Sequence, residues 1–198
     1  MRICVYGAAS NRIDPAYIRA AEELGEAMAK RGHGLVFGGG ASGMMGGVAR
    51  GVSRHGGEII GVAPTFFQVD GVLYPHCTTF LPTETMRERK ALMEETADAF
   101  VITPGGIGTW EEFFEVLTLK QLGRHNKPIA VYNLQGYYDP MHRMLQEAVA
   151  QDFVRQENFT LCPFFTGLAP MLAYLEAPPP PEGPVPLYRE GAGEETQI

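Results

Sequence analysis

The alternation of short apolar runs with longer amphipathic stretches most constrains how this chain can fold. The continuous apolar runs cover residues 3–6, 35–37, 59–63, 99–103 and 129–132. Short, uninterrupted apolar runs are typical of strands that are covered on both faces. The runs therefore predict five strands of a parallel sheet.

Helical patterns fill the intervals between the predicted strands. Asp14-Pro15 is an N-cap followed by a first-turn proline, and it opens a helical pattern that ends at Gly32. Further helices are predicted over residues 43–55, 84–97, 109–122 and 138–151. The alternation predicts an α/β fold, a single-domain Rossmann-like doubly wound parallel sheet with helices on both faces. Ligands of such folds bind at the carboxyl ends of the strands.

The length of 198 residues suits one domain, which we expect to span residues 1–176. Residues 177–198 differ, because they hold six of the 15 prolines and show almost no apolar periodicity. This composition is typical of a disordered tail or of an extended arm.

Charge and cysteine content argue against several classes of protein. Sixteen Lys and Arg against 23 Asp and Glu give a net charge of -7, which disfavours binding to nucleic acid polymers or to anionic membranes. The three cysteines form no CxxC pair and the five histidines form no i, i+4 pair, so we expect no metal site and no disulfide framework. The N-terminal apolar stretch is too short for a signal peptide, and no run approaches the roughly 20 residues of a membrane span. We therefore expect a cytoplasmic protein.

Two of the predicted strands end in glycine-rich turns that lead into a helix. The first turn covers residues 37–47, FGGGASGMMGG, and the second covers residues 103–112, TPGGIGTWEE. Glycines let successive backbone N–H groups converge on an anion, and the helix that follows adds the positive end of its dipole. Both turns are therefore candidate phosphate sites. The alternative is that the glycines serve only tight turns and close packing of helix on sheet.

Neither turn fits the common nucleotide-binding motifs. No Lys-Ser or Lys-Thr pair follows the glycines, as a P-loop would require. The first predicted strand, where a dinucleotide fingerprint normally lies, ends in Gly7-Ala8-Ala9-Ser10 instead. A kinase or a dehydrogenase is therefore disfavoured.

An arginine interrupts the apolar face of the helix predicted over residues 84–97. Spacings of three and four residues place on this face Met86, Arg89, Met93 and Ala97. A guanidinium on an inward face needs an anionic partner, which is either a protein carboxylate or a ligand.

Glu111 and Glu112 fall in the first turn of the helix predicted over residues 109–122, where the helix dipole favours an ionised carboxylate. A fixed negative charge there can stabilise a cation or orient a water molecule. The alternative is the acidic decoration common at helix starts, which is the simpler interpretation for Glu111 together with Glu115. Glu112 points about 100° away from Glu111, so only one of the two can face the strand-end crevice well.

These residues resemble the motifs of a known family. Residues 104–112, PGGIGTWEE, match the PGGxGTxxE motif of the LOG-like proteins, which are often called lysine decarboxylases but are cytokinin riboside 5'-monophosphate phosphoribohydrolases. Arg89-Lys90, between Met86 and Met93, matches the second motif of that family, MHxRKxxM. The segment 38–46 is similar to its GGGxxGLMG segment, and the resemblance covers about residues 2–160.

The resemblance implies a hydrolase that cleaves the N-glycosidic bond of nucleoside 5'-monophosphates, AMP and N6-modified AMP, to free base and ribose 5-phosphate. It implies that Arg89 and Glu112 are catalytic. It assigns substrate binding to Met86, Lys90, Gly105, Gly106, Ile107, Gly108, Thr109, Glu111 and Thr118. It also implies a homodimer that needs no cofactor and no metal.

Two departures from the family pattern concern base preference. Arg87 stands where the family usually has His, and the first predicted strand ends in GAAS where many members have CGSS or GGSS. The rival function is a non-catalytic carrier of a nucleotide or of the molybdenum cofactor on the same fold. A carrier needs the phosphate loop but not Arg89 and Glu112, which favours the hydrolase. No lysine lies in a recognisable PLP-binding context, so the decarboxylase name finds no support.

Overall fold

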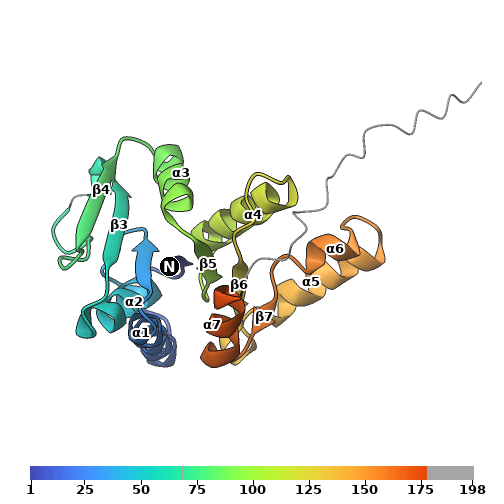
Figure 1. Ribbon diagram of the computed structural model, residues 1–198, viewed down its shortest axis with the longest axis horizontal. Coiled ribbons are helices and arrows are strands. Elements are labelled where there is room, and N and C mark those ends of the chain that lie inside the picture. Colours follow the sequence, from blue (N-terminus) through green and yellow to red (C-terminus); the bar gives the residue numbers. More distant parts are fainter. Residues whose placement is uncertain (68, 178–198) are drawn as a thin grey trace, which may run out of the picture.

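A computed structural model describes residues 1–67 and 69–177 of the chain. Its centre is a seven-stranded sheet in which all neighbouring strands are parallel, in the order β4-β3-β2-β1-β5-β6-β7 (Figure 1). The strands are β1 (Arg2–Tyr6), β2 (Gly34–Phe37), β3 (Ile59–Pro64), β4 (Thr79–Thr83), β5 (Ala99–Ile102), β6 (Ile129–Tyr132) and β7 (Phe164–Phe165).

Helices connect most of the strands, as is usual in a parallel sheet, whereas the described residues between β3 and β4 form only a short 3-10 turn. The helices are α1 (Pro15–Lys30), α2 (Gly43–Arg54), α3 (Met86–Thr96), α4 (Ile107–Gln121), α5 (Asp139–Ala150), α6 (Gln156–Phe159) and α7 (Leu168–Glu176), with short 3-10 turns η1 (Thr65–Phe67) and η2 (Leu134–Gly136). Asp14 caps α1 as predicted, because its side chain accepts a hydrogen bond from the N–H of Ala16 and Pro15 follows.

The sheet separates two hydrophobic cores. α1, α2 and α7 cover one face (Figure 1), where Leu24, Val48 and Leu172 are buried. α3, α4 and the start of α5 cover the other face, where Met93 and Phe113 are buried. The prediction of a Rossmann-like doubly wound sheet with helices on both faces is confirmed.

The apolar pattern does not predict β4, β7, α6 or α7. β4 lies at one edge of the sheet, is only partly buried and contains Pro82, which cannot donate a backbone hydrogen bond. β7 lies at the other edge and has two residues. Edge strands of this kind carry too little apolar periodicity to be recognised.

The start of α4 corrects the prediction for the acidic pair. α4 begins at Ile107, with Gly106 as its N-cap, and not at Thr109. Glu111 and Glu112 therefore lie in the second turn. The effect of the helix dipole falls off within the first turn, so the predicted stabilisation of their charge by the dipole was wrong.

The central strand β1 pairs with β2 on one side and with β5 on the other, so the strand order reverses beside it. The loops after these three strands meet at the carboxyl edge of the sheet. This reversal is the position at which doubly wound folds bind their ligands.

The described chain ends just beyond α7, whose Met171, Leu172 and Leu175 are buried in the core. Apart from Ala177, the predicted tail lies outside the described residues.

Candidate active site

The loop after β1 links the two glycine-rich turns. The N–H of Ala8 donates to the carbonyl of Pro104 at 3.1 Å, and the carbonyl of Ala8 accepts from the N–H of Met44 at 2.8 Å. A Cβ on Gly7 would lie 2.2 Å from Oγ1 of Thr103, so glycine allows this close approach of β1 and β5. The two turns are therefore fixed relative to each other.

In the first glycine-rich turn, the N–H groups at the start of α2 are bound by acceptors of the protein itself. At the start of α2, the N–H of Gly43 donates to Oδ1 of Asn11 at 2.7 Å. The N–H groups of Met44 and Met45 both donate to the carbonyl of Ala8, at 2.8 and 3.3 Å. Because protein acceptors occupy these donors, the prediction of a phosphate site at the start of α2 was wrong.

The second glycine-rich turn differs in this respect. Within residues 1–67 and 69–177, no protein acceptor is recorded for the N–H groups of Gly106, Ile107, Gly108 and Thr109. Gly106 to Gly108 are exposed, whereas Thr109 is buried against Gly105, whose missing Cβ would lie 2.2 Å from Oγ1 of Thr109. The start of α4 is thus a cluster of unpaired donors at the positive end of a helix, which suits an anion.

Arg89 and Glu112 form a buried ion pair beside the turn. Nη1 of Arg89 lies 2.7 Å from Oε1 of Glu112, and the side chains are 8% and 11% exposed. Nε of Arg89 donates to the carbonyl of Val62 at 3.3 Å. A Cβ on Gly38 would lie 2.0 Å from Nη2, so the glycine provides the space that the guanidinium fills. The first glycine-rich turn therefore makes room for the arginine.

The ionisation of Glu112 is set by burial and by its partner. Burial raises the pKa of Glu112 above 4.5, while the charge and the hydrogen bond of Arg89 act in the opposite direction. The arginine thus takes the role that the sequence assigned to the helix dipole. The result is a carboxylate fixed in position, with little water around it.

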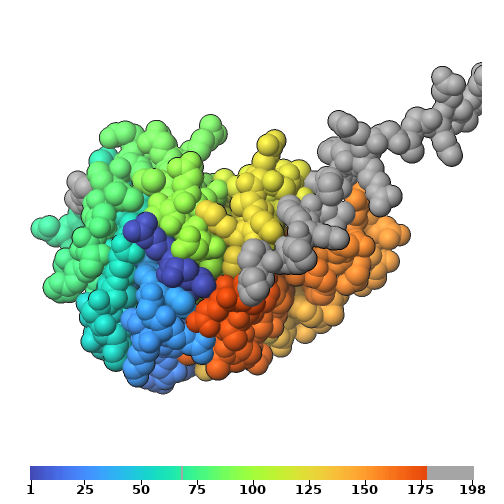
Figure 2. All heavy atoms as spheres, viewed as in Figure 1, coloured from blue at the N-terminus to red at the C-terminus, as the bar shows by residue number. Residues whose placement is uncertain are grey.

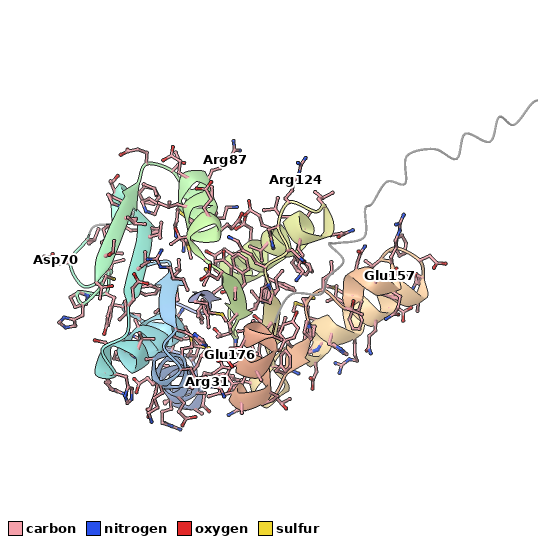
Figure 3. The ribbon with its side chains drawn as sticks, in the orientation of Figure 1. Arg31, Asp70, Arg87, Arg124, Glu157 and Glu176 are labelled. Atoms are coloured by element: carbon pink, nitrogen blue, oxygen red, sulfur yellow. The ribbon has the colours of Figure 1, made fainter. Side chains whose placement is uncertain are left out.

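Lys90 lies next to Arg89 on α3 and joins α3 to α4. Its ammonium group contacts the carboxylates of Glu111 and Glu115, the second at 2.5 Å. Burial opposes the charge of Lys90, but the hydrogen bonds of both carboxylates raise its pKa. Figure 2 shows α3 and α4, in green and yellow, as neighbours along the upper side of the molecule. Arg87, in contrast, is exposed and extends outward from α3 (Figure 3).

A cavity of about 340 Å³ opens on the other side of Arg89. Its lining consists of small, apolar or uncharged residues besides the arginine: Ala9, Gly38, Gly40, Ser42, Met45, Phe67, Gly71, Val72, Leu73, Met86 and Arg89. Such a lining suits an uncharged, largely apolar part of a ligand, with one guanidinium to orient it.

Not every residue that the resemblance assigns to substrate binding lies beside Arg89, Glu112 and the second glycine-rich turn. Thr118 is exposed two turns farther along α4, beside a separate groove of about 120 Å³. Ile107 and Met86 do lie at the site, although both side chains are exposed: Ile107 is the first residue of α4, and Met86 lines the cavity beside Arg89. Arg89, Lys90, Glu111 and Glu112, together with the turn, are the residues that the fold brings together.

Two tyrosines contact the turn although the sequence pattern gave no sign of it. The hydroxyls of Tyr137 and Tyr138 donate to the carbonyls of Gly105 and Thr103. Both follow η2, and neither apolar periodicity nor a motif marked them as part of the site.

Another hollow, of about 600 Å³, lies at the amino edge of the sheet. Its charged residues pair with each other: Arg2 binds Glu58 through its side chain and Asp98 through its backbone N–H. In the described part of the chain, no cluster of three or more His, Cys, Asp or Glu side chains could hold a metal ion. None of the described helices is long and apolar enough to cross a membrane.

Known proteins resemble this chain over most of its length. The model of a family described as "Possible lysine decarboxylase" matches residues 45–174. Cytokinin riboside 5'-monophosphate phosphoribohydrolase LOG of Oryza sativa subsp. japonica is 40% identical over 156 residues, which are 79% of this chain and 64% of that protein. Cytokinin riboside 5'-monophosphate phosphoribohydrolase LOG7 of Arabidopsis thaliana is 38% identical over 153 residues, 77% of this chain and 70% of that protein. The chain thus spans about two thirds of the length of these relatives.

Solved structures share the fold. The molybdenum cofactor binding protein of Rippkaea orientalis has a TM-score of 0.64 at 18% identity, covering 87% of this chain and 93% of that one. The molybdenum cofactor carrier protein of Chlamydomonas reinhardtii has a TM-score of 0.64 at 21% identity with the same coverage. At these identities the similarity shows the fold alone, whereas the family model and the plant relatives are similar in sequence over most of the chain. The chain therefore belongs to the LOG family of cytokinin riboside 5'-monophosphate phosphoribohydrolases.

Proposed function

We propose that this protein hydrolyses the N-glycosidic bond of nucleoside 5'-monophosphates, AMP and N6-modified AMP, to free base and ribose 5-phosphate. The observation that carries the proposal is the buried pair of Arg89 and Glu112, next to the unpaired N–H groups at the start of α4. The names of the plant relatives support the same reaction.

The pair suits the charge that develops in this reaction. The bond between C1' of the ribose and the base nitrogen breaks, the base leaves with the bonding electrons and takes up a proton, and water adds to C1'. The sugar passes through a cation-like state, which the fixed carboxylate of Glu112 stabilises. Nη2 of Arg89, for which no protein acceptor is recorded among the described residues, can orient the substrate or assist the departing base.

The start of α4 provides for the 5'-phosphate. Four N–H groups, from Gly106 to Thr109, converge at the positive end of a helix of 15 residues. The cavity beside Arg89 provides for the base, because it is of the size of a small ligand site and largely apolar. An apolar substituent on N6 of adenine suits Met45, Val72 and Leu73 in its wall.

Two substitutions and two substrates test the proposal. Glu112→Gln keeps the volume but removes the charge, so we expect kcat for AMP to fall on the order of 100-fold, or about 3 kcal/mol of transition-state stabilisation. Glu111→Gln is the control, because the side chain of Glu111 is 53% exposed and binds Lys90. Adenosine should be a far poorer substrate than AMP. Free base is followed by chromatography, and full activity of both variants would refute the mechanism.

The alternative function is a non-catalytic nucleotide or molybdenum-cofactor carrier. The shared fold of the cofactor-binding proteins favours it. A carrier has no use for the buried pair of Arg89 and Glu112. Tight retention of AMP without release of adenine would decide for the carrier.

Decarboxylation of lysine, which the description of the family model names, fits the site less well. A lysine that forms a Schiff base needs a lowered pKa. Although burial opposes it, Glu111 and Glu115 raise the pKa of Lys90 and so keep its amine protonated.

We also propose that the protein is a homodimer. α4 and α5 form an apolar groove of about 430 Å³. Its lining residues carry no charge: Trp110, Phe114, Tyr137, Tyr138, Pro140, Met141 and Met144. Two copies that each carry a net charge of -7 repel each other least where charges are absent. Light scattering of Phe114→Glu, expected to be monomeric, tests this interface.

We also propose that the protein is located in the cytoplasm. Cys4, Cys77 and Cys162 are free thiols, and Cys4 and Cys162 are buried. Unpaired thiols are typical of a reducing compartment. Imaging of the tagged protein in its own cell tests the location.

A further inference from the structure

Two adjacent tyrosines hold the backbone of the second glycine-rich turn. Oη of Tyr137 donates to the carbonyl of Gly105 at 2.6 Å, and Oη of Tyr138 donates to the carbonyl of Thr103 at 2.8 Å. The two hydroxyls therefore fix the carbonyls on either side of Pro104.

The bond from Tyr137 decides which way the peptide between Gly105 and Gly106 faces. In a trans peptide the carbonyl oxygen and the following N–H point in opposite directions. Because the carbonyl of Gly105 turns toward Tyr137, the N–H of Gly106 turns away from it. There it joins the unpaired N–H groups of the first turn of α4. The reversed peptide would place a carbonyl oxygen among these donors and would repel an anion.

The two glycines do not prevent such a reversal by themselves. Glycine adopts positive and negative φ about equally well. A Cβ on Gly106 would meet no atom within 4 Å, so no neighbouring group presses on the backbone from the side-chain position of Gly106. Among the described residues, the side chain that hydrogen-bonds to the peptide between Gly105 and Gly106 is that of Tyr137.

Tyr137 is itself held firmly. Its ring packs edge-on against Tyr17, with centroids 6.2 Å apart, and against Tyr138 at 4.9 Å. Oδ1 of Asn133 accepts from the N–H of Tyr138 at 2.7 Å, and Gly136 has a φ of 73°, which shapes the turn before the tyrosines. Burial raises the pKa of Tyr137, so its hydroxyl remains a donor at neutral pH.

We propose that Tyr137 is a positioning residue for phosphate recognition, whose hydroxyl keeps the N–H of Gly106 turned toward the 5'-phosphate of the substrate. This inference rests on the proposed function. Tyr137 acts on the affinity for the phosphate group through the backbone, and not on cleavage of the glycosidic bond.

Tyr137→Phe tests the inference because it retains the ring and removes the hydroxyl. Calorimetry with ribose 5-phosphate should show binding about tenfold weaker than in the wild type, since the loop loses one aligned donor to a charged group. KM for AMP should rise by a similar factor with kcat within twofold, while kcat/KM for adenosine, which has no phosphate, should not change. Tyr17→Phe is the matched control, because no hydrogen bond is recorded for its hydroxyl among the described residues.

The possible outcomes separate the two proposals. Unchanged affinity of Tyr137→Phe for ribose 5-phosphate overturns the inference, and so do equal losses for AMP and adenosine, which indicate general damage to the fold. A wild type that cleaves AMP no better than adenosine overturns the phosphate site and the inference together. A wild type that prefers AMP, with the preference reduced in Tyr137→Phe and kept in Tyr17→Phe, supports both.

Discussion

Gly38→Ala should disable the protein through a single added methyl group. The new Cβ would lie 2.0 Å from Nη2 of Arg89, whereas ordinary contact begins at 3.4 Å. The backbone of Gly38 is not in the left-handed region, so the alanine itself causes no strain. The guanidinium must therefore retreat by roughly 1 Å or more. This movement disturbs the 2.7 Å contact with Glu112.

The expected loss follows from that displacement. A misplacement of about 1 Å in a reactive arrangement costs on the order of 100-fold in rate, so we expect kcat/KM for AMP to fall by about this factor. The fold should survive, because the clash involves the end of a side chain and both charges remain. Release of adenine by chromatography and the melting temperature are measured together.

Gly34→Ala is the control for an added methyl group, because Gly34 lies in β2, the strand that directly precedes Gly38. Its Cβ would lie 2.9 Å from Oε2 of Glu58, an exposed carboxylate at the amino edge of the sheet, so activity should be kept. If Gly38→Ala turns over AMP at the rate of Gly34→Ala, the position of the Arg89 guanidinium does not limit catalysis and the argument fails.

Three further predictions concern pH and the chain end. Burial and the charge of Glu115 raise the pKa of Glu94 to about 7, so the stability that Glu94 contributes to the folded protein is complete below pH 4.5 and is lost as the pH rises through about 7. In urea titrations at pH 8, the Glu94→Gln variant should therefore be more stable than the wild type by about 1 kcal/mol after allowance for solvent screening. Equal stability of the two proteins at pH 8 would contradict this. Because burial raises the pKa of Glu112, kcat should decline on acidification at a pH above 4.5 while the melting temperature holds, and a decline only below 4.5 would speak against it. Deletion of residues 178–198 should leave kcat/KM within a few-fold, because α7 already completes the core; loss of the dimer in light scattering would show instead that this segment docks on a partner.

The sequence predicted the structure best where a single physical cause, such as burial on both faces of a strand or the period of a helix, determines the pattern of residues. Continuous apolar runs predicted the five inner strands, because a strand covered on both faces must be apolar throughout. The inward position of Arg89 could be predicted from its spacing with Met93, since a helix repeats its faces every three to four residues. Its partner Glu112 was named by the resemblance, and the ion pair appeared only when α3 and α4 were placed together.

The prediction for the acidic pair failed at a helix boundary, since α4 begins at Ile107 and not at Thr109, whereas the prediction for the first glycine-rich turn failed because of contacts between distant segments. Nothing local in the first glycine-rich turn shows that Asn11 and Ala8 occupy the N–H groups of α2, or that Gly38 leaves room for a guanidinium. The same holds for Tyr137, which reaches a carbonyl 32 residues away in the sequence. Backbone hydrogen bonds of loops are set by tertiary packing, and residue type alone carries little information about them.

The two ends of the strand order bear on how the protein behaves when it is concentrated. Unpaired backbone groups at a sheet edge can recruit a strand from another molecule, which is a route to fibrous aggregates. One edge here carries Pro82, which has no N–H to offer, and the other edge strand is only two residues long. Such edges give an incoming strand little to bind, so we expect concentrated solutions to stay free of fibres.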